Sequence, residues 1–148
     1  MLDRWDRILL VVVLVSVASL GLWAGFSPRS FYDNFPGGGH AWVSADGPYN
    51  EHLVRDVGEA NLGLAFVVVL ALWRRSTMLA FAAAAAVAIA YTPHLVYHVR
   101  HIDAFPTTGD KVGAIGALIV GVLAPIVLAV RIVRRGDLAQ PTEARALT

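Results

Sequence analysis

The chain has 148 residues, of which 57% are hydrophobic, and its mean hydropathy is +0.61. A soluble domain of this length rarely reaches such an apolar composition, so the sequence indicates a protein embedded in a lipid bilayer. The net charge is +1 and there is no basic cluster with interleaved aromatic residues, which argues against nucleic acid as a partner. Cysteine is absent, so no disulfide holds a loop.

The first expected element is an apolar helix over residues 8–26, a stretch without charged residues. Its length is close to the roughly 20 residues that cross the hydrocarbon core of a bilayer. The stretch is longer than the apolar region of a secretory signal, and Leu22-Trp23-Ala24 is a poor cleavage site. We therefore expect a retained membrane span.

A loop over residues 27–50 follows, in which aromatic residues stand among prolines and a run of three glycines. Tyrosine and tryptophan settle where one end of the ring is apolar and the other wet. The loop is therefore expected either to form an aromatic belt at the membrane surface or to act as a lid over a polar site. His40, directly after the glycines, is expected to be solvated. The aromatic residues of the loop are Phe31, Tyr32, Phe35, Trp42 and Tyr49.

Three further spans are expected over residues 52–73, 77–99 and 112–130, with a second outer loop over residues 100–110. Only residues 74–76 separate the second span from the third, so these two spans form a tight antiparallel hairpin. The predicted fold class is all-α, with one domain over residues 1–135 that forms an integral membrane four-helix bundle. Residues 136–148 are expected to be a disordered cytoplasmic tail.

Basic residues in the short connections predict the orientation. The amino terminus, the turn at residues 74–75 and the carboxyl end hold eight of the twelve Lys and Arg residues. Both termini are therefore expected to be cytoplasmic, in a multi-pass protein of the bacterial inner (plasma) membrane. Both outer loops, seven of the eleven acidic residues and all five histidines then face outward.

Polar residues recur on both helices of the hairpin. Two sets have the spacing i, i+4, i+7, namely His52, Asp56 and Glu59, and His94, His98 and His101. Each set therefore lies on one face of its helix. Because the turn is centred near residue 75, His52 is expected at the height of His98, and Asp56 at the height of His94. A rise of about 1.5 Å per residue places these groups inside the outer leaflet.

Ionisable groups at that depth cost roughly 2.5 to 3.5 kcal/mol each unless they are paired, hold a ligand or face a wet cavity. The set predicts a divalent metal site, with zinc preferred and iron, copper or manganese as alternatives. Its expected ligands are His52, Asp56, Glu59, His94 and His98. Three other interpretations stay open: a proton or quinone site, a structural polar network and, least favoured, haem with two axial histidines.

A bound metal would make a metal-dependent enzyme the natural extension. Glu59 is then the expected general base, and Tyr91, at the same height, a hydrogen-bond donor. A substrate that enters from the outer leaflet is expected to be a lipid or an isoprenoid-like molecule. The alternative is a non-enzymatic accessory subunit of a membrane complex, for example a respiratory one. Such a subunit would have a membrane-protein partner or a second copy of itself beside it in the bilayer.

Two segments of the hairpin carry a resemblance. Residues 50–61 (NEHLVRDVGEAN), followed by residues 93–98 (PHLVYH), resemble uncharacterised small four-span integral membrane proteins of actinobacteria. The resemblance covers the central half of the chain. It implies a four-helix membrane fold and supplies no activity, so no catalytic residue is carried over from it.

Overall fold

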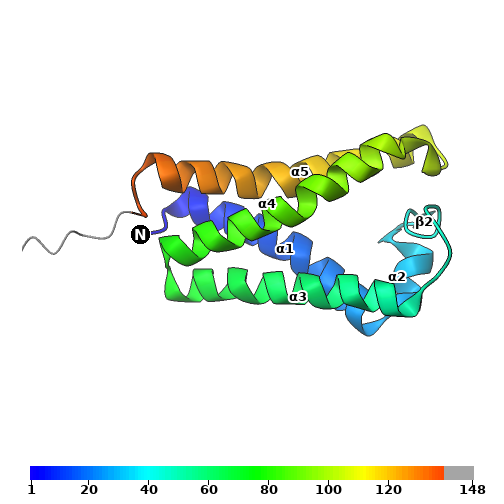
Figure 1. Cartoon of the computed structure of the whole chain (residues 1–148), viewed down its shortest axis with the longest axis horizontal. Helices are drawn as coiled ribbons and strands as arrows, with labels where there is room; N and C mark the ends of the chain where they lie inside the picture. Colours follow the sequence, from blue (N-terminus) through cyan, green and yellow to red (C-terminus); the bar gives the residue numbers. More distant parts are fainter. Residues whose placement is uncertain (139–148) are drawn as a thin grey trace, which may run out of the picture.

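Four long helices form most of the computed structural model, which describes residues 1–138 (Figure 1). They are α1 (Arg4–Phe26), α3 (Glu51–Arg74), α4 (Thr77–Arg100) and α5 (Thr108–Arg134). All four are long and apolar enough to cross a membrane, and each expected span lies inside one of them. The all-α prediction is therefore confirmed. The expected tail at residues 136–148 lies outside the described residues from residue 139 onward.

A polar side chain precedes each long helix and accepts a hydrogen bond from a backbone N–H of its first turn. The capping residues are Asp3, Asn50, Ser76 and Thr107. Because these caps and the polar first turns precede the apolar runs, α1 and α5 begin four residues earlier than hydropathy predicts. α3 ends at Arg74, and the capping residue Arg75 takes the left-handed conformation with φ 51° and turns the chain into α4.

The first outer loop is more ordered than the sequence predicts. It contains the short helix α2 (Pro28–Asn34) and two antiparallel strands, β1 (Pro36–Gly37) and β2 (His40–Ala41). The connection needs glycine, because Gly37, Gly38 and Gly39 have φ values of 101°, 65° and 85°. The second outer connection contains a short 3-10 helix, η1 (Ile102–Ala104).

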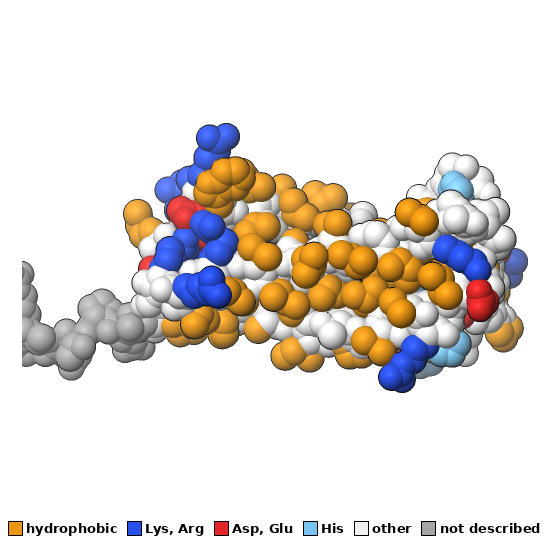
Figure 2. Space-filling view, turned by 90° about the horizontal axis from the view of Figure 1, so that it is seen from above, with side chains coloured by type: hydrophobic (Ala, Val, Ile, Leu, Met, Phe, Trp, Pro, Cys, Tyr) orange, Lys and Arg blue, Asp and Glu red, His pale blue; other side chains and the backbone are white. Residues whose placement is uncertain are grey.

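The connections divide between two ends of the bundle (Figure 1). We call the end that holds the amino terminus, the α3–α4 turn and the carboxyl end of α5 the inner end. We call the end that holds α2, the strands and the α4–α5 connection the outer end. Charged side chains gather at both ends, with hydrophobic side chains over the surface between them (Figure 2). This distribution fits helices that cross an apolar layer.

Two helix pairs meet in one apolar core. α1 packs along α3, and α4 packs along α5. The largest fully buried side chains include Leu10 and Val17 of α1, Val68 of α3 and Leu128 of α5. α4 contributes mostly alanines to this core, so it can approach its neighbours closely.

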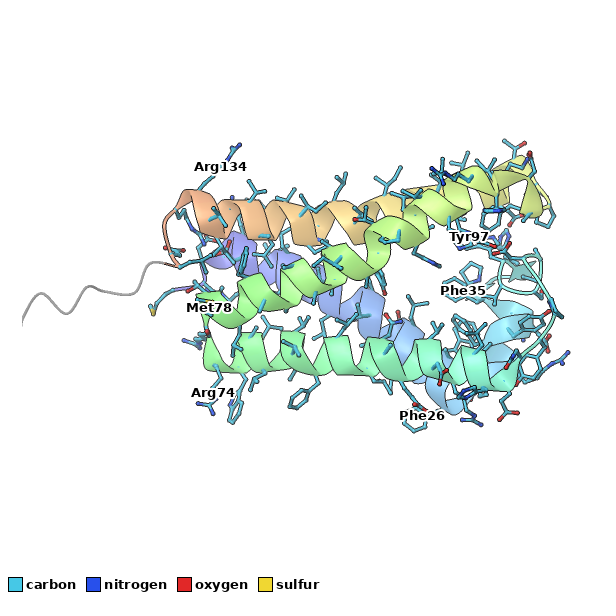
Figure 3. All side chains as sticks on the ribbon, viewed as in Figure 1. Phe26, Phe35, Arg74, Met78, Tyr97 and Arg134 are labelled. Carbon is cyan, nitrogen blue, oxygen red and sulfur yellow. The ribbon has the colours of Figure 1, made fainter. Side chains whose placement is uncertain are left out.

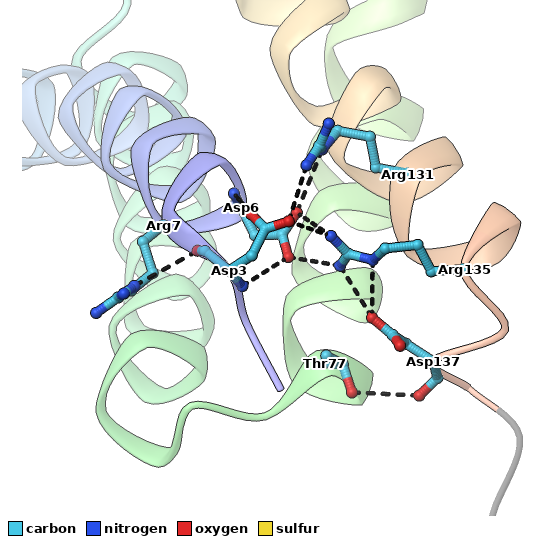
Figure 4. Close-up of polar contacts among 7 residues, drawn as sticks. All are labelled: Asp3, Asp6, Arg7, Thr77, Arg131, Arg135 and Asp137. Atoms are coloured by element: carbon cyan, nitrogen blue, oxygen red, sulfur yellow. Dashed lines mark hydrogen bonds and ion pairs between the residues drawn. The ribbon is translucent and has the colours of Figure 1, made fainter.

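An ionic cluster joins α1 to the end of α5 at the inner end (Figure 4). Asp6 is 0% exposed and pairs with Arg135 at 2.5 Å and with Arg131 at 3.4 Å. Both arginines also contact Asp3. The pKa of Asp3 is lowered, first by the hydrogen bond from the backbone N–H of Asp6 and then by the two arginines. The sequence analysis used these arginines only to predict the orientation of the protein in the membrane. Their pairing with Asp3 and Asp6 comes from the structure.

Glycines allow a close approach between α1 and α3. A Cβ atom at Gly58 would lie 2.2 Å from the backbone nitrogen of Gly25 and 2.6 Å from its Cα. A Cβ atom at Gly21 would lie 2.9 Å from the backbone nitrogen of Leu62. The two helices therefore touch backbone to backbone at this crossing, as small residues allow in membrane helices.

We expect Gly58→Ala to separate α1 from α3 and to lower the melting temperature of the detergent-solubilised protein. The added methyl group meets backbone atoms that cannot rotate away, and overpacking of this kind costs about 1–3 kcal/mol. Gly63→Ala is the matched control, because nothing lies within 4 Å of its Cβ position. It should keep or raise the melting temperature, since Ala favours a helix over Gly by about 1 kcal/mol. Equal melting temperatures for the two variants would contradict the proposed crossing.

Candidate functional site

A cavity of about 650 Å³ lies in the outer half of the bundle, between the α1–α3 pair and the α4–α5 pair. Most of its wall is apolar or aromatic, with contributions from all four long helices and from both outer connections. The polar residues on the wall are Ser16, Ser19, Asp46, Asn61, Tyr91, His94 and His98, together with the indole N–H of Trp42. A cavity of this size is in the range of small-molecule sites, about 300–1,000 Å³.

The first outer loop covers this cavity. Its residues Phe31, Phe35, Trp42 and Asp46 all line the wall, and we call residues 31–46 the lid. Phe35 projects from the lid toward the space between α3 and α4 (Figure 3). Edge-to-face contacts join Phe35 to Trp42, and Trp42 to Phe105 of the second outer connection.

One buried carboxylate anchors the lid. Asp110, in the first turn of α5, is 5% exposed and accepts hydrogen bonds from Trp42 Nε1 at 2.7 Å and from Thr107 Oγ1 at 2.6 Å. His40 Nδ1 lies 2.6 Å from the same carboxylate. His40 is exposed, as expected, and its half-exposed ring also pairs with an acidic group 70 residues away.

Two polar groups deep in the cavity satisfy each other. The Tyr91 hydroxyl donates to Asn61 Oδ1 at 2.6 Å, and Asn61 Nδ2 donates to the carbonyl of Val57 at 2.8 Å. This pair joins α3 to α4 across the hairpin. Tyr91 thus faces the cavity, but its partner is Asn61 and not Glu59, whose side chain does not line the cavity.

His94 and His98 lie next to each other on the cavity wall. Their ring centroids are 4.6 Å apart at an interplanar angle of 89°. His98 also contacts the Phe105 ring, at 5.5 Å. The third histidine of this helix, His101, stacks on Tyr97 at 4.2 Å outside the cavity. Two of the five expected metal ligands are therefore together in one site.

The other three expected ligands lie elsewhere. They are exposed on the face of α3 that points away from the bundle, and they are His52, Asp56 and Glu59. The His52 side chain is 88% exposed and lies 3.5 Å from Asp56. None of the three lines the cavity. Equal height on the hairpin did not bring the side chains together, because each helix presents its i, i+4, i+7 face in a different direction. Within residues 1–138, no group of three or more His, Asp or Glu side chains could hold one metal ion.

Comparisons of the chain with protein-family models, with curated proteins and with solved structures give no match. The candidate site is formed by residues that the geometry brings together. They are the two adjacent imidazoles, the lid above them and the apolar cavity below.

We expect Trp42→Phe to loosen the lid without unfolding the bundle. Phe keeps a ring against Phe105 but cannot donate to Asp110, and hydrogen bonds to charged acceptors are among the stronger ones in proteins. Amide hydrogen exchange in residues 36–46 should accelerate roughly tenfold or more. Trp73→Phe, at an exposed position at the inner end, is the control and should leave that exchange unchanged. Unchanged lid exchange in Trp42→Phe would show that the bond to Asp110 does not hold the lid.

Proposed function

We propose that the protein binds an amphipathic molecule of the lipid or isoprenoid class in the cavity beneath the lid. The single observation that carries this proposal is the cavity itself, with an apolar wall and two adjacent imidazoles near its lid end. An apolar chain would lie against the aliphatic side chains of α1, α3 and α5. A polar head would lie between the imidazoles and the lid.

The setting supports a ligand taken from the bilayer. Four helices of membrane-spanning length surround the cavity, so a lipid-soluble molecule can reach it without crossing water. We place the protein in the bacterial plasma membrane with both termini cytoplasmic and the lid facing outward. The arginines and the ionic cluster at the inner end support this orientation, since basic residues concentrate on the cytoplasmic side.

We expect geranylgeraniol, a simple isoprenoid alcohol, to raise the melting temperature of the purified protein in lipid nanodiscs. Ala117→Phe should abolish this rise, because Ala117 lines the cavity and the larger ring would fill it. Ala86→Phe is the matched control, an exposed alanine of α4 outside the cavity wall, and should keep the rise. Equal responses of the two variants, or no response of the wild-type protein, would contradict binding in this cavity.

Metal-dependent catalysis stays a prediction from the sequence. His94 and His98 are two imidazoles on one wall, and a catalytic zinc site ordinarily has three protein ligands. Glu59, the expected general base, lies outside the cavity wall that Tyr91 shares. We therefore favour ligand binding over catalysis.

The exposed face of α3, which carries Asp56 and Glu59, favours a second candidate function, as an accessory subunit of a membrane complex. Asp56 and Glu59 are exposed on α3, five and eight residues after its first residue, Glu51, and the apolar run of the helix begins next to them at Ala60. Within residues 1–138, no Lys, Arg or His lies within ion-pair distance of Glu59. Carboxylates at membrane depth almost always meet a partner. Charge complementarity points to a helix of another protein with a Lys or Arg in its outer half.

A designed transmembrane peptide tests this second candidate. We expect a Leu/Ala peptide with one Arg in its outer half to associate with the protein in liposomes, measured by energy transfer between fluorophores. Asp56→Asn with Glu59→Gln should weaken the association about tenfold, whereas Glu51→Gln, whose carboxylate already pairs with Arg55, should not. A peptide with Leu in place of Arg should not associate. Wild-type dimers that the double substitution abolishes would assign this face to a second copy and contradict the candidate.

A further inference from the structure

Most polar groups on the cavity wall are already engaged within the protein. The hydroxyl groups of Ser16 and Ser19 donate to carbonyls of their own helix, at 3.0 and 3.1 Å. Tyr91 and Asn61 bond to each other, and the indole N–H of Trp42 donates to Asp110. These groups present little free hydrogen-bonding capacity to a ligand.

The free capacity is concentrated at the two histidines below the lid, His94 and His98, and at the lid residue Asp46. Neither imidazole forms a hydrogen bond within residues 1–138, and Nδ1 of His98 is buried there without a partner. Asp46 has one long contact, 3.5 Å from the Tyr97 hydroxyl. A bound molecule would therefore place its polar atoms at this end.

The charge of the wall restricts the head group of that molecule. The described residues that line the cavity include no Lys or Arg, and Asp46 supplies a carboxylate. A phosphate or carboxylate head would be desolvated beside a like charge without a cation to pair with, which is costly. A neutral imidazole can donate or accept a hydrogen bond, according to its tautomer, so it suits carbonyl and hydroxyl oxygens equally.

The shape of this end favours a flat head group. The rings of Phe35, Trp42, Phe105 and Tyr91 all line the cavity around the two imidazoles. Aromatic side chains stack on or meet the edges of other planar rings with ring centroids about 4.5–7 Å apart. The remaining wall, toward the centre of the bundle, is aliphatic and suits a branched hydrocarbon chain.

We infer that the ligand is a prenylated quinone or its quinol, with the oxygenated ring beside His94 and His98 under the lid and the isoprenoid chain along the aliphatic wall. This inference rests on the proposed function and names the head group of its ligand. In the quinone the carbonyl oxygens accept hydrogen bonds from the imidazoles, and in the quinol the hydroxyl groups donate to an imidazole and to Asp46. The inference concerns binding and includes no electron transfer.

A titration of the protein in nanodiscs tests the inference, with a naphthoquinone that carries four isoprene units as the probe. Geranylgeraniol, the same kind of chain without the ring, is the reference ligand. We expect the quinone to bind at least fivefold more tightly, since each added hydrogen bond contributes roughly that factor. His98→Phe should remove this preference while geranylgeraniol binding persists, because Phe keeps the ring volume without the nitrogens. His101→Phe, at a histidine outside the cavity, is the control and should retain the preference.

Each outcome separates the two proposals. Binding of geranylgeraniol without a preference for the quinone overturns the inference and leaves the proposed function in place. Failure of both ligands to bind overturns the proposed function. Tighter binding of a long-chain amine than of the quinone would show that Asp46 selects a cation, and would also overturn the inference. His98→Gln, which keeps hydrogen-bonding groups at this position, should recover part of the preference if His98→Phe fails to fold.

Discussion

The backbone contact between α1 and α3 is the constraint on which the rest of the structure depends. Gly58 on α3 lies against Gly25 on α1 without space for a side chain, so these helices form one closely packed pair. α4 turns away from α3 along its length and packs on α5 (Figure 1). The bundle therefore consists of two helix pairs, which lie closer together at the inner end than at the outer end. At the inner end, Asp6 and Arg135 hold the pairs together. At the outer end the pairs diverge, and the cavity and its lid occupy the space between them.

The polar residues of the outer half serve two different purposes. Some complete the architecture, such as the Tyr91–Asn61 pair that joins the hairpin and the carboxylate of Asp110 that receives the lid. Others lack a hydrogen-bond or ion-pair partner within residues 1–138, namely His94 and His98 in the cavity and Glu59 on α3. Unused polar groups in an apolar environment are costly, which is the reason that we propose a ligand at the first place and a partner helix at the second. The cavity suits a small ligand, whereas the face of α3 is open and suits a helix.

Hydropathy was enough to predict four helices, because each run of apolar residues is long and is ended by charged or loop-forming residues. The same analysis missed α2 and the two strands, because a segment rich in proline and glycine has no helical or strand periodicity of its own. Its structure depends on tertiary contacts, such as the packing of Phe31 and the hydrogen bond from Trp42 to Asp110. For the site, equal height on the hairpin was predictable from residue numbers. The direction of each polar face was not, because helix rotation depends on where Gly58 and Tyr91 pack. This is why His94 and His98 reached the cavity and His52, Asp56 and Glu59 did not.

The carboxylate of Asp110 has a consequence beyond holding the lid. It also accepts from the backbone N–H of Thr107 as part of the capping box that starts α5, so one side chain stabilises both a helix terminus and a loop 70 residues earlier in the chain. A fluctuation that detaches the lid leaves the first turn of α5 with a more mobile cap, and fraying of that turn removes the acceptor from the lid. The lid and the start of α5 should therefore behave as a single cooperative unit of local opening, separate from the core beneath them.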